Sequence, residues 1–311
     1  MTSAADVGVR DTRAARDVRE AHASPDPAAR HGRRRRRDQR RQRLAAWAAI
    51  IVLGLFGLFP IYWMLVTALT PNELAFQFPP QLVPSEPTLS HFVDFFDDPT
   101  LLRFLFNSAL VATLTAVLTL AVATLMGYSF SKFRYRGRAS LMYLVLSSQM
   151  FPHALLLITL FMMYSSLGLL YTYAGVVLSF SAFTLPLCVW IMKSFFDTVP
   201  DSLLEAGALD GAPRWRILIS IVLPLAKPGL LAAGLFAFVR GWNDFIFALT
   251  LAGPEKMTLP PGLVNTYLGE FQTSWPALMA ASLVVSLPVV VVFISLQRYL
   301  VGGMVAGSVR E

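Results

Sequence analysis

The sequence predicts an all-α membrane protein with six transmembrane helices. Hydrophobic residues make up 55% of the 311 residues and charged residues only 14%, whereas soluble domains carry roughly 25% charged residues. Six apolar stretches are each long enough to cross a hydrocarbon core of about 30 Å as a helix. Because lipid offers no partners to backbone N–H and C=O groups, stretches of this length are expected to be helical.

The second of these spans is the longest and is expected to extend beyond the membrane as helix. Prolines 60, 152, 186 and 288 lie inside spans and are expected to weaken local backbone hydrogen bonding, either as hinges or as bends. The spans are placed at Leu44–Leu69, Phe104–Ser131, Ser140–Ser165, Ala174–Lys193, Gly229–Leu251 and Trp275–Gln297.

The residues before the first span, 1–43, are expected to form a disordered basic tail, since they are rich in Ala, Arg, Asp and Pro. An arginine run, Arg33–Arg37 followed by Arg40, Arg41 and Arg43, ends where the first span starts. Its position favours a cytoplasmic anchor on anionic lipid. Binding to nucleic acid is disfavoured, because the run lacks interleaved aromatic residues and a folded module.

Cations in the connections between spans predict the orientation. The segment 70–103 has Arg103 as its only cation against five acidic residues, and it holds many prolines, so it is expected outside, irregular, with a short helix near Ser90–Phe96. The segment 254–274 is also expected outside, where it contacts a partner or caps the solute path. Both termini are then cytoplasmic. The cations of the inner connections are Lys132, Arg134, Arg136 and Arg138, then Lys193, Arg214, Arg216 and Lys227.

A mostly polar segment, residues 194–228, separates the fourth and fifth spans, and we call it the elbow. Pro200 and the pair Ser202 and Glu205 suit the start of a short helix with a capping box. The run 210–213, Asp-Gly-Ala-Pro, is expected to end that helix and allow a second one to begin. The sequence therefore predicts two short helices that form a rigid knob.

The elbow resembles the EAA loop of ABC-importer permeases, which reads Glu-Ala-Ala, three residues, Gly, nine residues, then Ile-x-Leu-Pro. Glu205, Ala206, Gly211, Ile221, Leu223 and Pro224 match at full spacing, and Gly207 replaces the second alanine. The resemblance runs from about Leu44 to Glu311. Within the family, the sequence is similar to the carbohydrate-uptake branch, and most of all to maltose-type permeases. Its further matches are Asn107-Ser108, Leu167-Gly168-Leu169, Phe195-Phe196, Pro200, Trp242-Asn243-Asp244-Phe245 and Gly302-Gly303.

The resemblance implies a type I ABC importer permease, or MetI-like, architecture over residues 44–311, in the bacterial cell membrane. It implies a sugar as solute, a maltose- or trehalose-like oligosaccharide. The implied partners are a second, related permease in a heterodimer, a dimeric ABC ATPase that holds ATP and Mg, an extracytoplasmic solute-binding protein and membrane lipid, with no nucleic acid.

Within this family the elbow is a cytoplasmic coupling helix that seats in a cleft of the ATPase. Glu205 would pair with a basic group there, and Gly211 would form the tight bend; the alternative for Glu205 is a solvated surface carboxylate. The residues implied in ATPase coupling are Glu205, Ala206, Gly207, Asp210, Gly211, Ile221, Leu223 and Pro224.

The chain has no Gly-x-x-x-x-Gly-Lys-Ser/Thr motif and no Gly-Lys pair, so it is not expected to hold ATP phosphates itself. No catalytic set, cofactor site or metal site is expected either, and a membrane-embedded enzyme is disfavoured. An ion-coupled secondary transporter of a small polar solute remains the alternative, although it does not explain the elbow. No similarity between the first and last three spans supports such a carrier.

The fifth span carries two charges, Arg240 and Asp244, and Arg240 lies ~16 Å along it from Gly229. A charge at the bilayer centre is expected to face a partner or water, since exposure to lipid costs roughly 2.5–3.5 kcal/mol. The two form either an i,i+4 pair that holds helices together or a polar wall of the solute path. His153 is expected as a packed or mouth-lining residue. The candidate path residues are Gln149, Arg240, Trp242, Asn243, Asp244 and Phe245.

Overall fold

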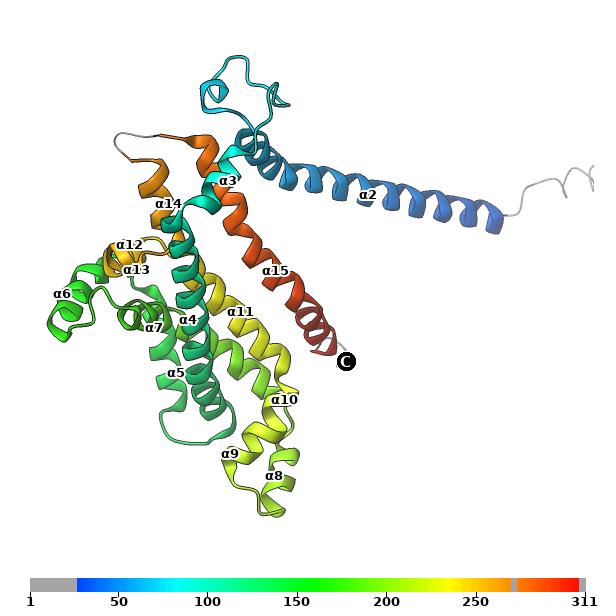
Figure 1. The fold of residues 1–311 in the computed structure, drawn as a ribbon. Helices are drawn as coiled ribbons and strands as arrows, with labels where there is room; N and C mark the ends of the chain where they lie inside the picture. Colours follow the sequence, from blue (N-terminus) through cyan, green and yellow to red (C-terminus); the bar gives the residue numbers. More distant parts are fainter. Residues whose placement is uncertain (1–26, 270–272, 308–311) are drawn as a thin grey trace, which may run out of the picture. The chain divides into compact units, whose positions relative to one another are not determined.

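The computed structural model describes residues 27–269 and 273–307, and its regular elements within these ranges are all helices (Figure 1). Two units are distinguished, Met1–Tyr62 and Trp63–Glu311. Four helices are long and apolar enough to cross a membrane, and two bent pairs of helices bring the number to six if each pair is one span. The long ones are Arg41–Ala68 within α2 (Pro27–Ala68), α4 (Pro99–Lys132), α7 (Tyr173–Asp197) and Trp275–Gln297 within α15 (Trp275–Gly307).

The predicted disordered tail, residues 1–43, falls partly on residues 1–26, which lie outside the described residues. Residues 27–43 are helical in the structure and form the first part of α2. Arginine and alanine are good helix formers, so the basic run continues the helix of the first span.

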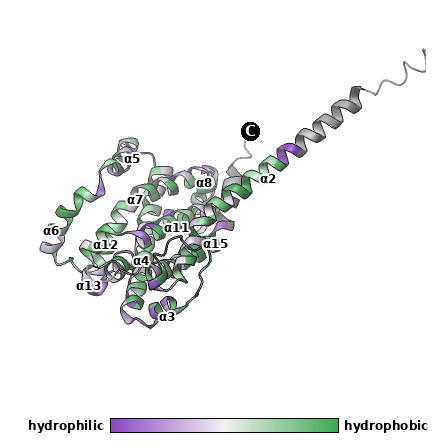
Figure 2. Ribbon diagram, turned by 90° about the horizontal axis from the view of Figure 1, so that it is seen from above, coloured by the Kyte–Doolittle hydropathy of each residue, from purple (hydrophilic) through white to green (hydrophobic). Residues whose placement is uncertain are grey.

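Helix α4 lies against α7 and α11 (Lys227–Asn243), while α15 packs on α11 and on α3 (Ser90–Asp97). Of the four long spans, α7 is the most enclosed. Hydrophobic residues dominate α6 (Leu157–Leu167) and α7, as the green ribbons of Figure 2 show. Helix α3 confirms the short helix predicted in the segment 70–103, which also holds a short 3₁₀ turn, η1 (Asn72–Leu74), and the start of α4 at Pro99.

The third predicted span is not one helix, and this corrects the prediction of a continuous Ser140–Ser165. It bends by 89° at Phe151 and Pro152. Proline has no N–H to donate and disfavours helical geometry in the residue before it; Phe151 is accordingly extended, with ψ 130°. The pieces are α5 (Arg138–Ser147), η2 (Ser148–Met150), η3 (His153–Leu156) and α6.

The fifth predicted span, Gly229–Leu251, is interrupted too, but without a proline. Helix α11 ends at Asn243, Asp244 is extended (φ −69°, ψ 133°), and α12 (Ile246–Leu251) begins anew. Prolines 60, 186 and 288, by contrast, lie inside continuous helices. After α12 come α13 (Gly253–Lys256) and α14 (Leu259–Tyr267).

The elbow consists of short helices, as predicted. Helix α8 (Asp201–Leu209) is followed by α9 (Arg214–Ile217), a π-helical segment η4 (Leu218–Val222) and α10 (Leu223–Leu225). The chain then bends by 83° at Ala226 into α11. The elbow helices and α12–α14 lie at opposite ends of α4 (Figure 1).

Candidate functional site

The turn between α8 and α9 satisfies its own backbone groups. Gly211 has a φ of +76°, a conformation that side chains with a Cβ disfavour. The N–H of Gly211 donates to the carbonyl of Ala208, and the N–H of Ala212 donates to that of Gly207, both at 3.0 Å. These two bonds make a Schellman motif. The predicted tight bend at Gly211 is therefore present.

The start of α8 differs from the prediction. Pro200 is the N-cap residue, and no side chain caps the helix, so Ser202 and Glu205 form no capping box. Proline can supply no side-chain acceptor, and the structure instead places Asp201 in the first turn, where a carboxylate is favourable. The hydrogen bond from Lys132, together with its charge, lowers the pKa of Asp201.

Gly207 makes contacts inside the elbow. A Cβ at this position would lie 3.1 Å from Cδ1 of Ile221 and 3.3 Å from Cγ1 of Ile217. Gly207 is buried, whereas Ala206 and Ala208 are exposed. The space beside Gly207 is therefore taken by the helical segment that follows the turn and is not open to another subunit.

The outer face of the elbow combines carboxylate side chains with solvent-exposed apolar side chains. Leu209 is 90% exposed and Trp215 64% exposed, and they flank the Schellman turn, Leu209 at the end of α8 and Trp215 in α9. Glu205, Asp210 and Pro224 are also exposed, while Ile221 and Leu223 are half-buried. Exposed hydrophobic residues beside a carboxylate are typical of a surface that a partner covers.

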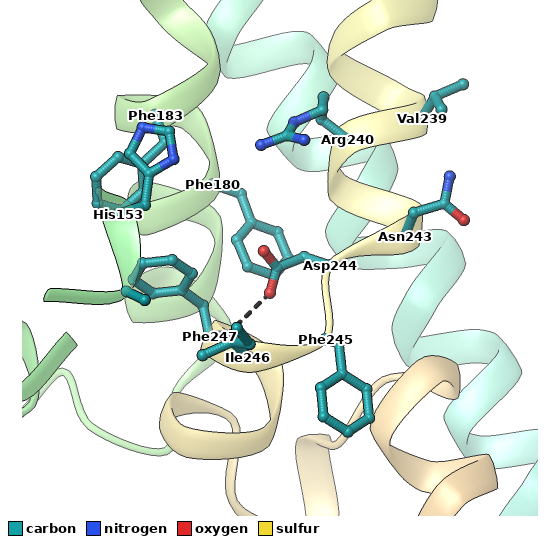
Figure 3. A pocket seen from close by; sticks show the side chains of 11 residues that line it. His153, Phe180, Phe183, Val239, Arg240, Asn243, Asp244, Phe245, Ile246 and Phe247 are labelled. Atoms are coloured by element: carbon teal, nitrogen blue, oxygen red, sulfur yellow. Dashed lines mark hydrogen bonds between the residues drawn. The ribbon is translucent and has the colours of Figure 1, made fainter. Parts of the chain in front are cut away.

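A pocket of ≈ 470 Å³ lies where the interruptions of the third and fifth spans meet (Figure 3). Arg240, Asn243, Asp244 and Phe245 from the predicted path line it, and so do side chains that the prediction missed or left open. The latter are His153, Ala154, Phe180, Phe183, Val239, Ile246 and Phe247.

The carboxylate of Asp244 holds the start of α12. Its Oδ1 accepts hydrogen bonds from the N–H groups of Phe247 (3.0 Å) and Ala248 (3.3 Å). Arg240 and Asp244 point into the pocket from the same side (Figure 3), but they form no ion pair within 4.0 Å. The i,i+4 pair is therefore absent, because α11 ends before Asp244.

Two predicted path residues lie outside the pocket lining. The ring of Trp242 is only 3% exposed and stacks on Phe238 at 5.6 Å, so it is a core residue. The side-chain amide of Gln149 donates to the backbone carbonyl of Phe183 at 2.8 Å. Gln149 thus connects the interrupted third span to the pocket wall without lining the pocket itself.

The missed residues are mostly aromatic. The ring of Phe183 lies 4.5 Å from that of His153 and 4.9 Å from that of Phe247. Phe180 and Phe183 are three residues apart on α7 and so share a face. That spacing was available in the sequence, but nothing in it showed which face of α7 meets the interruptions.

Residues 119–305, which include the elbow and every residue of the pocket, match the family described as binding-protein-dependent transport system inner membrane component. The chain belongs to this family. The protein is thus a multi-pass membrane subunit of a transport system rather than an enzyme, as predicted.

Curated relatives extend the match over most of this chain. The sulfoquinovosyl glycerol transport system permease protein SmoH of Agrobacterium fabrum is 36% identical over 256 residues, 82% of this chain and 89% of the relative. The trehalose/maltose transport system permease protein MalG of Thermococcus litoralis is 34% identical over 81% of this chain and 91% of the relative.

A solved structure confirms the predicted architecture of an ABC importer permease. It is a bacterial ABC transporter involved in the import of the acidic polysaccharide alginate, and the superposition covers 84% of this chain and 98% of that one. The TM-score is 0.70 at 24% sequence identity, so this likeness supports the fold.

Proposed function

We propose that this component is the membrane subunit of an ATP-driven importer that moves a sugar, a maltose- or trehalose-like oligosaccharide, delivered by an extracytoplasmic binding protein. The names of several relatives support a saccharide: trehalose/maltose for MalG, maltodextrin for MdxG of Bacillus subtilis and galactooligosaccharides for GanQ of the same organism. A second, related permease and a dimeric ATPase complete the complex.

The elbow is proposed to be the surface that receives the ATPase. The observation that carries this proposal is the exposure of Leu209, Trp215 and Glu205 around the Gly211 turn. The N–H groups of this turn are hydrogen-bonded within the elbow itself. Such a knob can transmit displacement as a unit, since its shape does not depend on the partner. Both termini and the elbow then lie on the cytoplasmic side, in agreement with the cations of the inner connections.

The pocket is proposed to be part of the solute path. Its wall combines the guanidinium of Arg240, the carboxylate of Asp244 and the amide of Asn243 with several aromatic rings. Ligand pockets are typically built in this way, from apolar and aromatic walls with a few polar groups that orient the ligand. The interruptions bring polar backbone and side chains to membrane depth, where they are tolerated when they line a cavity.

The test is uptake, together with ATP hydrolysis stimulated by the binding protein, in the reconstituted complex. Glu205→Lys reverses the charge that would meet a basic group of the ATPase, and Gly211→Trp distorts the turn. Both variants are expected to lose uptake and stimulated hydrolysis at least tenfold, whereas Glu73→Lys, an equal charge change on an exposed residue elsewhere, retains both. Normal uptake and hydrolysis in both elbow variants would refute the proposal.

The alternative, an ion-coupled carrier, predicts uptake by this chain alone. Proteoliposomes that contain only this chain would then take up solute when a proton or sodium gradient is imposed. Absence of such uptake, with uptake that requires ATP in the full complex, excludes the carrier.

A further inference from the structure

The cytoplasmic end of α4 is bonded to the start of the elbow, 67 to 69 residues further along the chain. The Nζ of Lys132 donates to the backbone carbonyl of Val199 at 2.5 Å and to Oδ1 of Asp201 at 2.7 Å. The Lys132 side chain is only 7% exposed, so its charge is held between α4 and α8 rather than in water.

The next residue makes a second connection. The guanidinium of Arg214, in α9, lies over the ring of Phe133 at 4.7 Å from its centroid, a cation–π contact. Phe133 is the C-cap residue of α4. Both short helices of the elbow are therefore attached to consecutive residues at one end of α4.

The opposite end of α4 is bonded to the segment that follows the pocket wall. Asn107 is fully buried, and its Nδ2 donates to the carbonyls of Glu255 (3.0 Å) and Met257 (2.9 Å). Its Oδ1 accepts from the hydroxyl of Tyr173 at 2.7 Å. The adjacent Ser108 accepts a bond from the N–H of Leu259 at 2.7 Å. This segment begins just after α12, whose first turn forms the pocket.

Between these two ends α4 is a single helix, and it touches its neighbours closely. From Asn107 to Lys132 it extends about 38 Å at 1.5 Å per residue. A Cβ at Gly127 would lie 2.8 Å from Cβ of Met192 in α7, and one at Gly241 in α11 would lie 3.1 Å from Cα of Ala112. Apolar packing is non-directional, whereas the hydrogen bonds at the two ends require specific directions.

We propose that α4 carries the displacement of the elbow to the segment 255–259 and so to the outer wall of the pocket, with Lys132 and Asn107 as positioning residues at its two ends. This inference rests on the proposed coupling role of the elbow. The two flanking helices α7 and α11 continue from the elbow through the chain itself; α4 is joined to it only by side chains, which makes the link removable by substitution.

The first experiment is Lys132→Met in the complete reconstituted transporter, measured as solute moved per ATP hydrolysed. Coupling between distant sites typically amounts to about 5- to 150-fold, and we expect the ratio to fall by at least about fivefold while ATP hydrolysis persists. Lys193→Met is the matched control, because Lys193 pairs within one helix, with Asp197 of α7 at 2.6 Å, and Asp197 keeps its own bond from Ser131 of α4. Lys132→Arg, which keeps the charge and donors, is expected to restore most of the ratio.

The second experiment addresses the other end of α4. Asn107→Leu keeps the side-chain size but removes all three hydrogen bonds, and we expect the same loss of transport per ATP. Asn72→Leu, at an exposed position of η1 where the side chain accepts a hydrogen bond from Ser274 at 2.7 Å, is its control. If both ends belong to one path, Lys132→Met combined with Asn107→Leu lowers the ratio little further than either alone, since coupled sites are non-additive.

The outcomes separate this inference from the proposed function. Normal uptake in Glu205→Lys and Gly211→Trp would overturn the coupling role of the elbow. Loss of uptake in those variants, with an unchanged ratio in Lys132→Met and Asn107→Leu, would overturn only the role of α4. Should Lys132→Met fail to assemble with the ATPase, Asp201→Ala removes the bond from Lys132 to α8 while the bond to the Val199 carbonyl remains, and an unchanged ratio there overturns the role of the bond between Lys132 and Asp201.

Discussion

The elbow and the pocket are both interruptions of helix, yet their backbones are held in different ways. In the elbow, Gly211 turns the chain and the Schellman bonds to Ala208 and Gly207 come from the preceding helix itself. In the pocket, the fifth span restarts on the side chain of Asp244, and the third span is tied to the carbonyl of Phe183 through Gln149.

The difference follows from the surroundings of each segment. At an exposed turn, any remaining N–H or C=O group bonds to water, so a local glycine signal is sufficient. Within apolar surroundings an unpaired backbone N–H or C=O group costs several kcal/mol of stability. Each interruption there needs a polar side chain as its hydrogen-bond partner. We therefore expect the loss of a polar side chain to lower stability more in the pocket than in the elbow, where the loss of the glycine at position 211 is expected to lower it.

The largest effect is expected for Asp244→Leu, which leaves the N–H groups of Phe247 and Ala248 without their acceptor. An unsatisfied buried group costs about 1–3 kcal/mol, so the loss of stability should be about 3 kcal/mol, seen as a lower Tm of the purified complex in detergent. Asp244→Asn retains an acceptor oxygen and should recover most of the Tm. An equal drop in both variants would show that charge, rather than the cap, matters.

The next largest effect is expected for a substitution of Arg240, and its neighbour Trp242 serves as the comparison. Arg240→Gln removes the cation from the pocket wall, and we expect uptake at limiting solute to fall at least tenfold, or about 1.4 kcal/mol. Trp242→Phe should leave uptake within about twofold and lower the Tm instead, because Trp242 packs in the core. Uptake assays and thermal unfolding on the same preparations distinguish the two; the reverse pattern would place Trp242 in the solute path.

A comparable effect, on stability rather than on uptake, is expected for Gly211→Ala, since a Cβ in left-handed geometry costs roughly 1–2 kcal/mol. Gly137→Ala carries the same strain at a φ of +84° outside the elbow. Both variants should lose similar stability in thermal unfolding, but only Gly211→Ala should lower ATP hydrolysis stimulated by the binding protein. Equal hydrolysis in the two variants would argue against a special role of the turn.

The smallest effect is expected for Gly207→Ala, which restores the alanine of the EAA pattern. The new Cβ meets Cδ1 of Ile221 at 3.1 Å and Cγ1 of Ile217 at 3.3 Å, both in side chains that can shift by a few tenths of an ångström, while alanine favours the helix by up to about 1 kcal/mol. The two terms nearly cancel, and stimulated ATP hydrolysis should change less than twofold. Gly207→Leu cannot be accommodated in this way and is expected to disrupt the elbow. A mild Gly207→Leu phenotype would contradict the close packing.

Local patterns in the chain were enough to place most of the helices and the elbow. Apolar length located the spans, and the Asp-Gly-Ala-Pro run located the turn at Gly211, because hydrophobicity and a positive φ are properties of a few adjacent residues. The same reasoning missed the interruption at Asp244, where no proline or glycine marks the break, and placed a capping box on Ser202 where none forms.

The remaining features depend on contacts between residues far apart in the chain. Whether Arg240 pairs with Asp244, whether Trp242 faces a path or a core, and which residues Asn107 and Lys132 bind could not be read from neighbouring residues. Each depends on which helix faces are brought together by the packing of α4, α7 and α11. Local chemistry specifies where a helix can start or stop, but the partner of a buried polar group is chosen by the packing that surrounds it.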